Sequence, residues 1–213
     1  MLRMNRFAQK PRLRWAEDQP AYGPIVLLTE GRSDTRILSA ALEAMVPHLA
    51  DLFSFLDFEE LKLEGGAGAL AKTVRAFVGA RVSTRMVAIF DNDTAGAAAL
   101  SNIANVQLPA NIRTIILPPS SVGSNYPTTG PQGVSCMDVD GLACSIEMYL
   151  GKAALRDEVG SLRPVRWTGW DAKMGRYQGE VEGKSQIQKS LLEALALLAS
   201  PLEARPRSQT SLR

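Results

Sequence analysis

Two stretches of this sequence decide its fold: PIVLLTEGRSD at residues 24–34 and MVAIFDNDTAG at residues 86–96. In each stretch, a short apolar run typical of a buried parallel strand ends in a turn that carries carboxylates. Ligands of an open α/β sheet bind outside the carboxyl ends of its strands, so the two turns are expected to converge on one crevice. Carboxylates gathered at one rim repel each other unless a cation lies between them, and oxygen ligands suit Mg²⁺, Mn²⁺ or Ca²⁺ better than zinc. The sequence therefore predicts a divalent-metal site on an α/β scaffold.

The rest of the chain predicts strands alternating with helices. Strands are expected at residues 25–29, 59–63, 86–90 and 112–117. Helices are expected from a cap at Ser33 or Asp34 to Pro47, at 67–78, 94–103 and 142–150, and from Ser185 to Pro201. This β-α-β order predicts an α/β fold whose parallel sheet has about four strands, right-handed crossovers and helices on both faces, followed by a C-terminal helical appendage.

Composition limits the class of protein. With 213 residues and 46% hydrophobic content, the chain can bury a full core, and one main domain with an appendage is expected. No uncharged apolar stretch is long enough to span a bilayer, and no apolar run follows the N-terminal arginines, so no membrane partner is expected. The sequence has two cysteines, Cys136 and Cys144, and one histidine, His48. These residues are too few for a Cys/His zinc site, and the low number of cysteines favours a reducing cytoplasm.

The expected organisation has four parts: a basic tail at 1–22, a metal-binding domain at 23–158, an extension with the closing helix at 159–200, and a polar tail at 201–213. Residues 118–135 are predicted to form a loop that borders the metal crevice and is mobile without substrate, and residues 160–183 an irregular excursion. Its aromatic cluster, Trp167, Trp170 and Tyr177, is expected to fold that excursion, with base stacking as the alternative.

The N-terminal tail carries basic residues without acids. Either it is a solvated tail, or these residues contact nucleic-acid phosphates. The candidate contacts are Arg3, Arg6, Lys10, Arg12 and Arg14.

TEGRSD followed by FDNDTAG resembles the Toprim domain, the metal-binding catalytic module of topoisomerases, bacterial primases and OLD-family nucleases. In that family a glutamate follows the first strand and a D-x-D pair follows a later one, which corresponds here to Glu30, Asp91 and Asp93. The E-G-x-x-D form, which adds Asp34, is most similar to the OLD-type nucleases. Ser145-Ile146-Glu147 resembles the downstream S-x-E element of that branch, and Lys184 its lysine beyond the sheet. The resemblance covers residues 24–150 well and 175–198 loosely.

This resemblance implies a nuclease that uses two Mg²⁺ or Mn²⁺ ions, with DNA favoured over RNA as its substrate, in phage defence or DNA repair. Glu30, Asp91 and Asp93 would hold one ion, and Asp34 and Glu147 the other. Such a pair of ions activates water and stabilises the leaving oxygen. Glu30 would bridge the ions or act as a general base, and Lys184 would offset charge on the phosphate. Asp140 is an additional candidate ligand, although a turn and cap role explains it more simply.

The chain has no GxxxxGK[ST] loop, whereas OLD nucleases usually carry an ATPase domain. A stand-alone module, or one that works with a separate ATPase or other effector subunit, is therefore expected.

Three alternatives remain open. The acids of both turns can simply favour or cap helix N-termini. The segment from Ile89 to Thr94 also fits the nucleophile motif of haloacid-dehalogenase-like phosphatases, with Asp91 as nucleophile and Asp93 as acid/base. That motif normally follows the first strand, however, and it leaves Glu30 unexplained. A non-catalytic Toprim-like binding module is the third alternative.

Overall fold

A four-stranded parallel sheet forms the centre of the molecule, in the strand order β2-β1-β3-β5. The computed structural model describes residues 23–56 and 64–199. The strands of this sheet are β1 (Ile25–Leu28), β2 (Phe53–Phe55), β3 (Met86–Phe90) and β5 (Ile112–Ile116). The α/β prediction is confirmed, and three of the four predicted strands lie where the sequence placed them. The predicted strand at 59–63 lies within residues 57–63, outside the described residues, and β2 precedes it.

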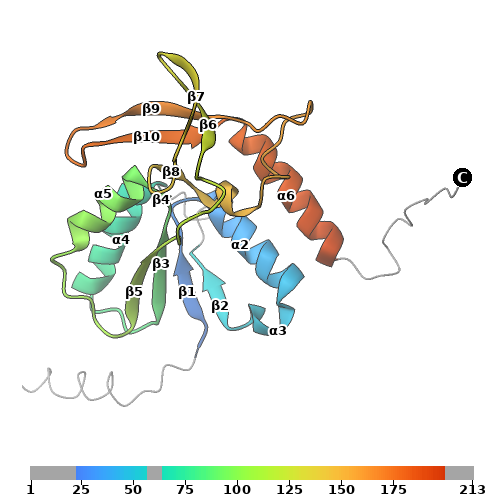
Figure 1. Cartoon of the computed structure of the whole chain (residues 1–213). Helices are drawn as coiled ribbons and strands as arrows, with labels where there is room; N and C mark the ends of the chain where they lie inside the picture. Colours follow the sequence, from blue (N-terminus) through green and yellow to red (C-terminus); the bar gives the residue numbers. More distant parts are fainter. Residues whose placement is uncertain (1–22, 57–63, 200–213) are drawn as a thin grey trace, which may run out of the picture.

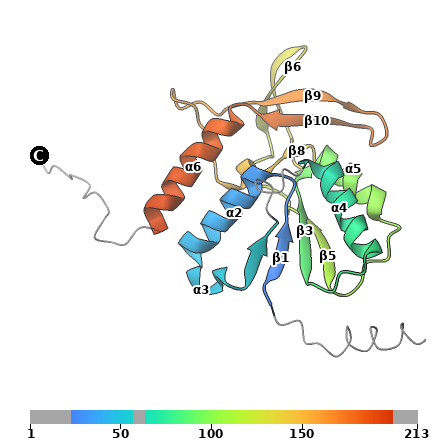
Figure 2. The same ribbon diagram turned by 180° about the vertical axis from the view of Figure 1, so that it is seen from behind.

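Helices cover both faces of this sheet (Figures 1 and 2). From β1 the chain moves one way along the sheet to β2, and from β2 it moves back past β1 to β3 and then β5. Because parallel strands are joined by right-handed crossovers, the helix after β1 lies on one face of the sheet and the helices after β2 and β3 lie on the other face. The helices are α2 (Arg32–Met45), the short α3 (Pro47–Ala50), α4 (Ala67–Gly79) and α5 (Thr94–Ile103). Alternate residues of β3, Met86, Ala88 and Phe90, are buried in one core with α4 and α5.

A second sheet lies across the carboxyl end of the first, in the order β10-β9-β6-β7 (Figure 1). Its strands are β6 (Tyr126–Gly130), β7 (Gly133–Met137), β9 (Val165–Asp171) and β10 (Arg176–Val181). The predicted loop at 118–135 is therefore confirmed at 118–125 but wrong from residue 126, where β6 begins, and the prediction of an irregular excursion at 160–183 was wrong. Glycine and proline suggested loops, but they lie beside β-branched and aromatic residues that favour strands. β6 pairs with β9 across the predicted boundary at residue 158.

The predicted helix at 142–150 is also wrong. The structure has a two-residue strand, β8 (Ala143–Cys144), paired with β4 (Asn92–Asp93), followed by a single 3₁₀ turn, η2 (Ile146–Tyr149). The apolar residues that suggested a helix fill a second core beneath β6, β9 and β10. An extended pair and one turn bury them without a regular helix.

The closing helix is confirmed as α6 (Lys184–Ala199), which lies alongside α2 in both views (Figures 1 and 2). Its Ile187 and Leu195 are buried. No helix among the described residues is long and apolar enough to cross a membrane.

Candidate active site

The first acidic turn follows β1 directly. Thr29 is buried, and its hydroxyl donates to the carbonyl of Gly31 at 2.9 Å and pairs with the Thr35 hydroxyl at 2.8 Å. Helix α2 then starts with Gly31 as its N-cap and has no side-chain cap. The predicted capping by Ser33 or Asp34 is therefore wrong: Asp34 lies in the first helical turn, where an acid also complements the helix dipole.

Glu30 joins the ends of two neighbouring strands. Its Oε1 accepts a hydrogen bond from the backbone N–H of Asp91 at 2.9 Å. Its backbone carbonyl accepts one from Gly66 at 2.6 Å, and Gly66 has a φ of 100°, which favours glycine. The two acidic turns thus lie side by side, with Glu30 held between them.

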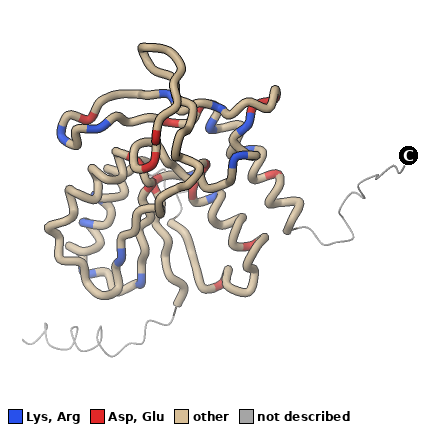
Figure 3. The backbone as a smooth tube through the Cα atoms, in the orientation of Figure 1, with Lys and Arg blue, Asp and Glu red and all other residues tan. Residues whose placement is uncertain are grey.

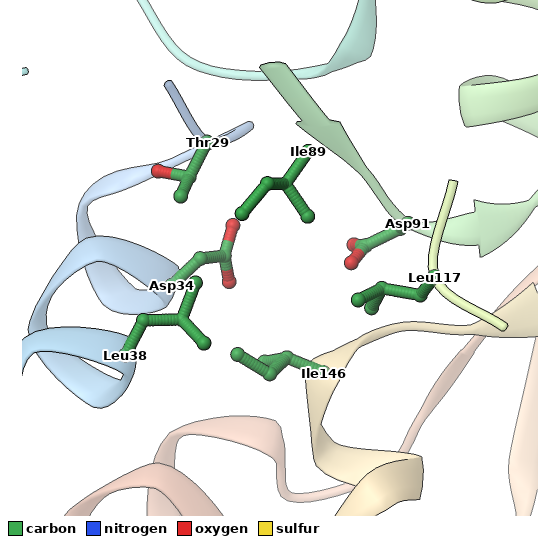
Figure 4. Close-up of a pocket in the computed structure, with 7 residues that line it drawn as sticks. All are labelled: Thr29, Asp34, Leu38, Ile89, Asp91, Leu117 and Ile146. Atoms are coloured by element: carbon green, nitrogen blue, oxygen red, sulfur yellow. The ribbon is translucent and has the colours of Figure 1, made fainter. Parts of the chain in front are cut away.

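Asp34 and Asp91 face a shared depression. Figure 4 shows their carboxylates pointing into the same space, which Thr29 and Leu117 also line. Apolar walls complete it, formed by Leu38, Ile89 and Ile146. Because apolar walls exclude water from these carboxylates, their charged forms are disfavoured.

The carboxyl groups of this cluster hold their protons unusually tightly. Burial is the main cause: it raises the pKa of Glu30 to about 7, that of Asp34 to about 6 and that of Asp91 to about 9. Repulsion from neighbouring carboxylates adds to all three shifts, whereas Lys184 opposes them. Shifts of this kind cluster at functional sites, although structural networks also produce them.

These shifts determine how stability depends on pH. The folded state binds more protons than the unfolded chain, whose carboxyl groups titrate near pH 4, so the free energy of unfolding falls as pH rises. The fall extends from about pH 4 through the folded pKa values, the highest of which is that of Asp91, about 9. At neutral pH the cluster therefore lowers the free energy of unfolding unless a cation binds close to its carboxylates.

Asp93 has a different environment. Its Oδ1 accepts a hydrogen bond from the N–H of Gly96 at 2.7 Å, so the capping alternative holds for this residue. Its Oδ2 accepts one from Nε2 of Gln178 on β10 at 2.7 Å. A Cβ on Gly96 would lie 2.2 Å from the carbonyl oxygen of Asp91. Only glycine therefore allows the backbone of α5 to approach the second acidic turn this closely.

Glu147 and Lys184 form an ion pair beside this cluster. Glu147 is fully buried, and its Oε2 lies 3.5 Å from the Lys184 Nζ. Ser145 and Gln188 each donate to its carboxylate at 2.5 Å. Burial lowers the pKa of Lys184, but the nearby carboxylates outweigh this and raise it. Both predicted residues thus reach the site, and both oxygens of Glu147 are already engaged by protein groups.

Asp140 acts as a structural acceptor. Its Oδ1 accepts hydrogen bonds from Nδ2 of Asn92 at 2.9 Å and from the N–H of Ser120 at 2.7 Å. These bonds hold the segment after β5 against β4. The observed contacts agree with the turn role weighed for Asp140.

Several residues of the site were missed by the sequence analysis. Gln178 and Gln188 hold two of the acids, but an isolated glutamine carries no sequence signal. Gly66 carried a signal, because the pair Gly65-Gly66 follows the predicted strand at 59–63 and is typical of a turn. The candidate phosphate contacts of the N-terminal tail, Arg3 to Arg14, lie outside the described residues.

The donor set of the cluster fits a hard divalent cation. Its groups are carboxylate oxygens, the ligands that such ions prefer. Burial and mutual repulsion raise their pKa values, and a bound cation would counteract both effects. As the side chains lie, no group of three or more His, Cys, Asp or Glu residues within the described ranges is arranged to hold a metal. Metal binding therefore stays a prediction.

Comparison with known proteins adds no further constraint. No protein-family model matches the chain, and neither does any curated protein or solved structure.

Proposed function

We propose that this protein is a divalent-metal-dependent nuclease of the Toprim type that hydrolyses phosphodiester bonds, in DNA rather than RNA. The observation that carries the proposal is the meeting of Glu30, Asp34 and Asp91 at the carboxyl ends of adjacent parallel strands, with Lys184 beside them. The resemblance of both turns to Toprim motifs supports the same assignment.

The residues that would hold Mg²⁺ or Mn²⁺ are Glu30, Asp91 and Asp93 for one ion, and Asp34 with Glu147 for the other. The ions would supply an activated water and neutralise charge on the leaving oxygen. Lys184 would offset negative charge on a bound phosphate, and its position beside the carboxylates of the cluster supports this role. A role in phage defence or DNA repair, with a separate ATPase or effector subunit, belongs to this proposal through the resemblance alone.

The test is cleavage of plasmid, linear DNA and RNA with Mg²⁺, Mn²⁺ or EDTA. Glu30→Ala and Asp91→Ala should each abolish metal-dependent cleavage while the fold survives, since removing one acid relieves repulsion. Glu193→Gln, at an exposed site on α6, is the matched control and should cleave normally. Near-normal cleavage by either Glu30→Ala or Asp91→Ala contradicts the proposal. A phosphoryl group trapped on Asp91 supports the phosphatase alternative instead.

A further inference from the structure

The side chain of Arg163, two residues before β9, lacks a hydrogen-bond partner. Its Nε is buried and has no acceptor among the described residues. Its guanidinium also forms no ion pair with an acid in the described part of the chain. A buried cationic donor without an acceptor costs stability, and an anionic ligand that accepts from it removes that cost.

The position of Arg163 is fixed through its backbone. Its N–H donates to the Leu155 carbonyl at 2.9 Å, and its carbonyl accepts from the hydroxyl of the buried Tyr126 at 2.9 Å. The carbonyl of Pro164 accepts from the N–H of Glu182 at 2.9 Å, which brings the end of β10 alongside. The Glu182 side chain is exposed and forms no ion pair with Arg163. A side chain on so fixed a backbone loses little freedom when it binds a ligand.

Gly183 leaves room for the guanidinium at the start of α6. A Cβ on Gly183 would lie 3.0 Å from Cζ of Arg163, so the guanidinium packs directly against this glycine. Gly183 also has a φ of 71°, which favours glycine. Lys184 follows as the first residue of α6, so a second cationic side chain begins one residue away. Figure 3 shows blue segments gathered around this part of the chain.

Lys184 connects this pair of cations to the acid cluster. Its Nζ lies 3.5 Å from Oε2 of Glu147, and it also interacts electrostatically with Asp34 and Asp91. The charge of Lys184 is therefore already used by these acids, whereas that of Arg163 is not. Arg163 thus supplies an uncompensated positive charge at the edge of the acid cluster.

The chemistry of these groups fits a phosphate. A guanidinium presents its N–H donors in a planar fork that matches phosphate oxygens, and the positive end of the α6 dipole adds to its attraction for anions. Ser185 and Gln186 in the first turn of α6 are exposed, so an anion can reach this place from solvent. Contacts to backbone phosphates fix the position of a nucleic-acid strand on a protein.

We infer that Arg163, packed on Gly183, binds a backbone phosphate of DNA that neighbours the scissile phosphate, and so positions the strand relative to the acid cluster. The inference rests on the proposed function for the identity of the phosphate ligand as DNA. The binding itself requires no cleavage.

The test measures binding of the full-length chain to a labelled DNA duplex by fluorescence anisotropy in EDTA, from about 50 to 200 mM KCl. Arg163→Gln should weaken binding roughly 5- to 50-fold at low salt, and should lower the slope of log Kd against log salt by about 0.9, the value for one phosphate contact. Arg163→Lys should retain most of the slope, because the charge remains. Arg75→Gln is the matched control and should leave the slope unchanged, since Arg75 is exposed on α4, on the face of the central sheet opposite α2.

Thermal unfolding separates this role from a purely structural one. Because the buried Nε of Arg163 has no acceptor, Arg163→Gln should leave Tm unchanged or raise it. A fall in Tm with an unchanged salt slope identifies a packing role on Gly183 and overturns the inference.

A duplex that carries one neutral methylphosphonate locates the contact. The wild type should lose affinity when the methylphosphonate occupies one particular position, and Arg163→Gln should lose no more there, because both changes remove the same contact. Additive losses at every position overturn the inference.

The remaining outcomes separate the two proposals. Cleavage by the wild type, with a salt slope that Arg163→Gln leaves unchanged, overturns this inference alone. Arg163-dependent DNA binding without cleavage under any metal condition overturns the proposed function alone. Arg163-dependent binding of inorganic phosphate, measured by calorimetry, with DNA affinity unaffected by Arg163→Gln, assigns the site to a small phosphate ligand and overturns the inference.

Discussion

Replacing Lys184 by methionine tests how the buried acids are balanced. Lys184 is the cation that lowers the pKa of Glu30, Asp34 and Asp91, and it pairs with the fully buried Glu147 at 3.5 Å. Methionine keeps much of the length and apolar character of the side chain but removes its charge. Lys184→Met should therefore keep the packing similar but remove the positive charge that offsets the repulsion between the acids.

The magnitude follows from the geometry of the pair. Removing one partner of a buried ion pair costs about 3–5 kcal/mol. Here the Lys184 side chain is 33% exposed, and Ser145 and Gln188 still donate to Glu147, so solvent and hydrogen bonds offset part of this cost. We expect a loss of about 1–3 kcal/mol, which corresponds to a fall in Tm of roughly 2–12 °C for a chain of this size.

The assay is thermal unfolding in EDTA at pH 7. Lys189→Met is the matched control on the same helix, because its pair with Glu193 spans 4.0 Å and both side chains are mostly exposed. Its effect should stay within about 0.5 kcal/mol. In a Glu147→Gln background, Lys184→Met should cost less, since the buried partner no longer carries a charge. Equal shifts in Tm for Lys184→Met and Lys189→Met would refute the reasoning.

Three further predictions concern the same cluster. In EDTA, Tm should fall as pH rises from 6 to 9, because Asp91 and Glu30 must release protons that they hold with pKa values of about 9 and 7, and Asp91→Asn should flatten this fall. A slope in Asp91→Asn equal to that of wild type contradicts the assignment. Gly96→Ala should destabilise the fold by several kcal/mol, roughly the range of severe core overpacking, because its Cβ would lie 2.2 Å from the Asp91 carbonyl. Gly68→Ala in α4, with nothing within 4 Å of its Cβ, should instead be neutral or stabilising by up to about 1 kcal/mol, and denaturant unfolding measures both. If Glu147 acts on transition-state charge, Glu147→Gln should lower kcat of DNA cleavage more than it raises KM, whereas unchanged kcat would leave Glu147 a purely structural role.

The central sheet could be predicted because its signals are local. A buried parallel strand is a bare apolar run, as in residues 25–28 and 86–90, and each run is followed by a helix with an apolar stripe. The alternating order of these elements then fixes handedness and placement. The acids Glu30 and Asp91 were predictable for the same reason, since they follow the ends of β1 and β3, and Asp34 lies four residues after Glu30 in the first turn of α2.

The second sheet was missed for two reasons: glycine and proline hid its local hairpins, β6–β7 and β9–β10, and the pairing that joins these hairpins is distant. β6 meets β9 through Thr128 and Val165, and the residues between them give no local indication of that contact. The two-residue pair of β4 and β8 is shorter than any periodicity can reveal. Gln178 holds Asp93 across 85 positions of sequence, so its role exists only once β10 is in place.

The contacts of the acids indicate where a ligand is most needed. Asp93 receives two hydrogen bonds, and Glu147 is held by Ser145, Gln188 and Lys184. Buried carboxylates that are satisfied in this way cost the fold little.

Glu30, Asp34 and Asp91 instead hold protons far above the usual pKa of a carboxyl group, which means that the folded protein at neutral pH carries them at a cost in stability. Neutral residues at Asp34 and Asp91 are therefore expected to make the fold more stable at neutral pH without a ligand. Stability alone thus gives no reason for these three acids at this edge of the sheet, whereas binding of a positively charged ligand does.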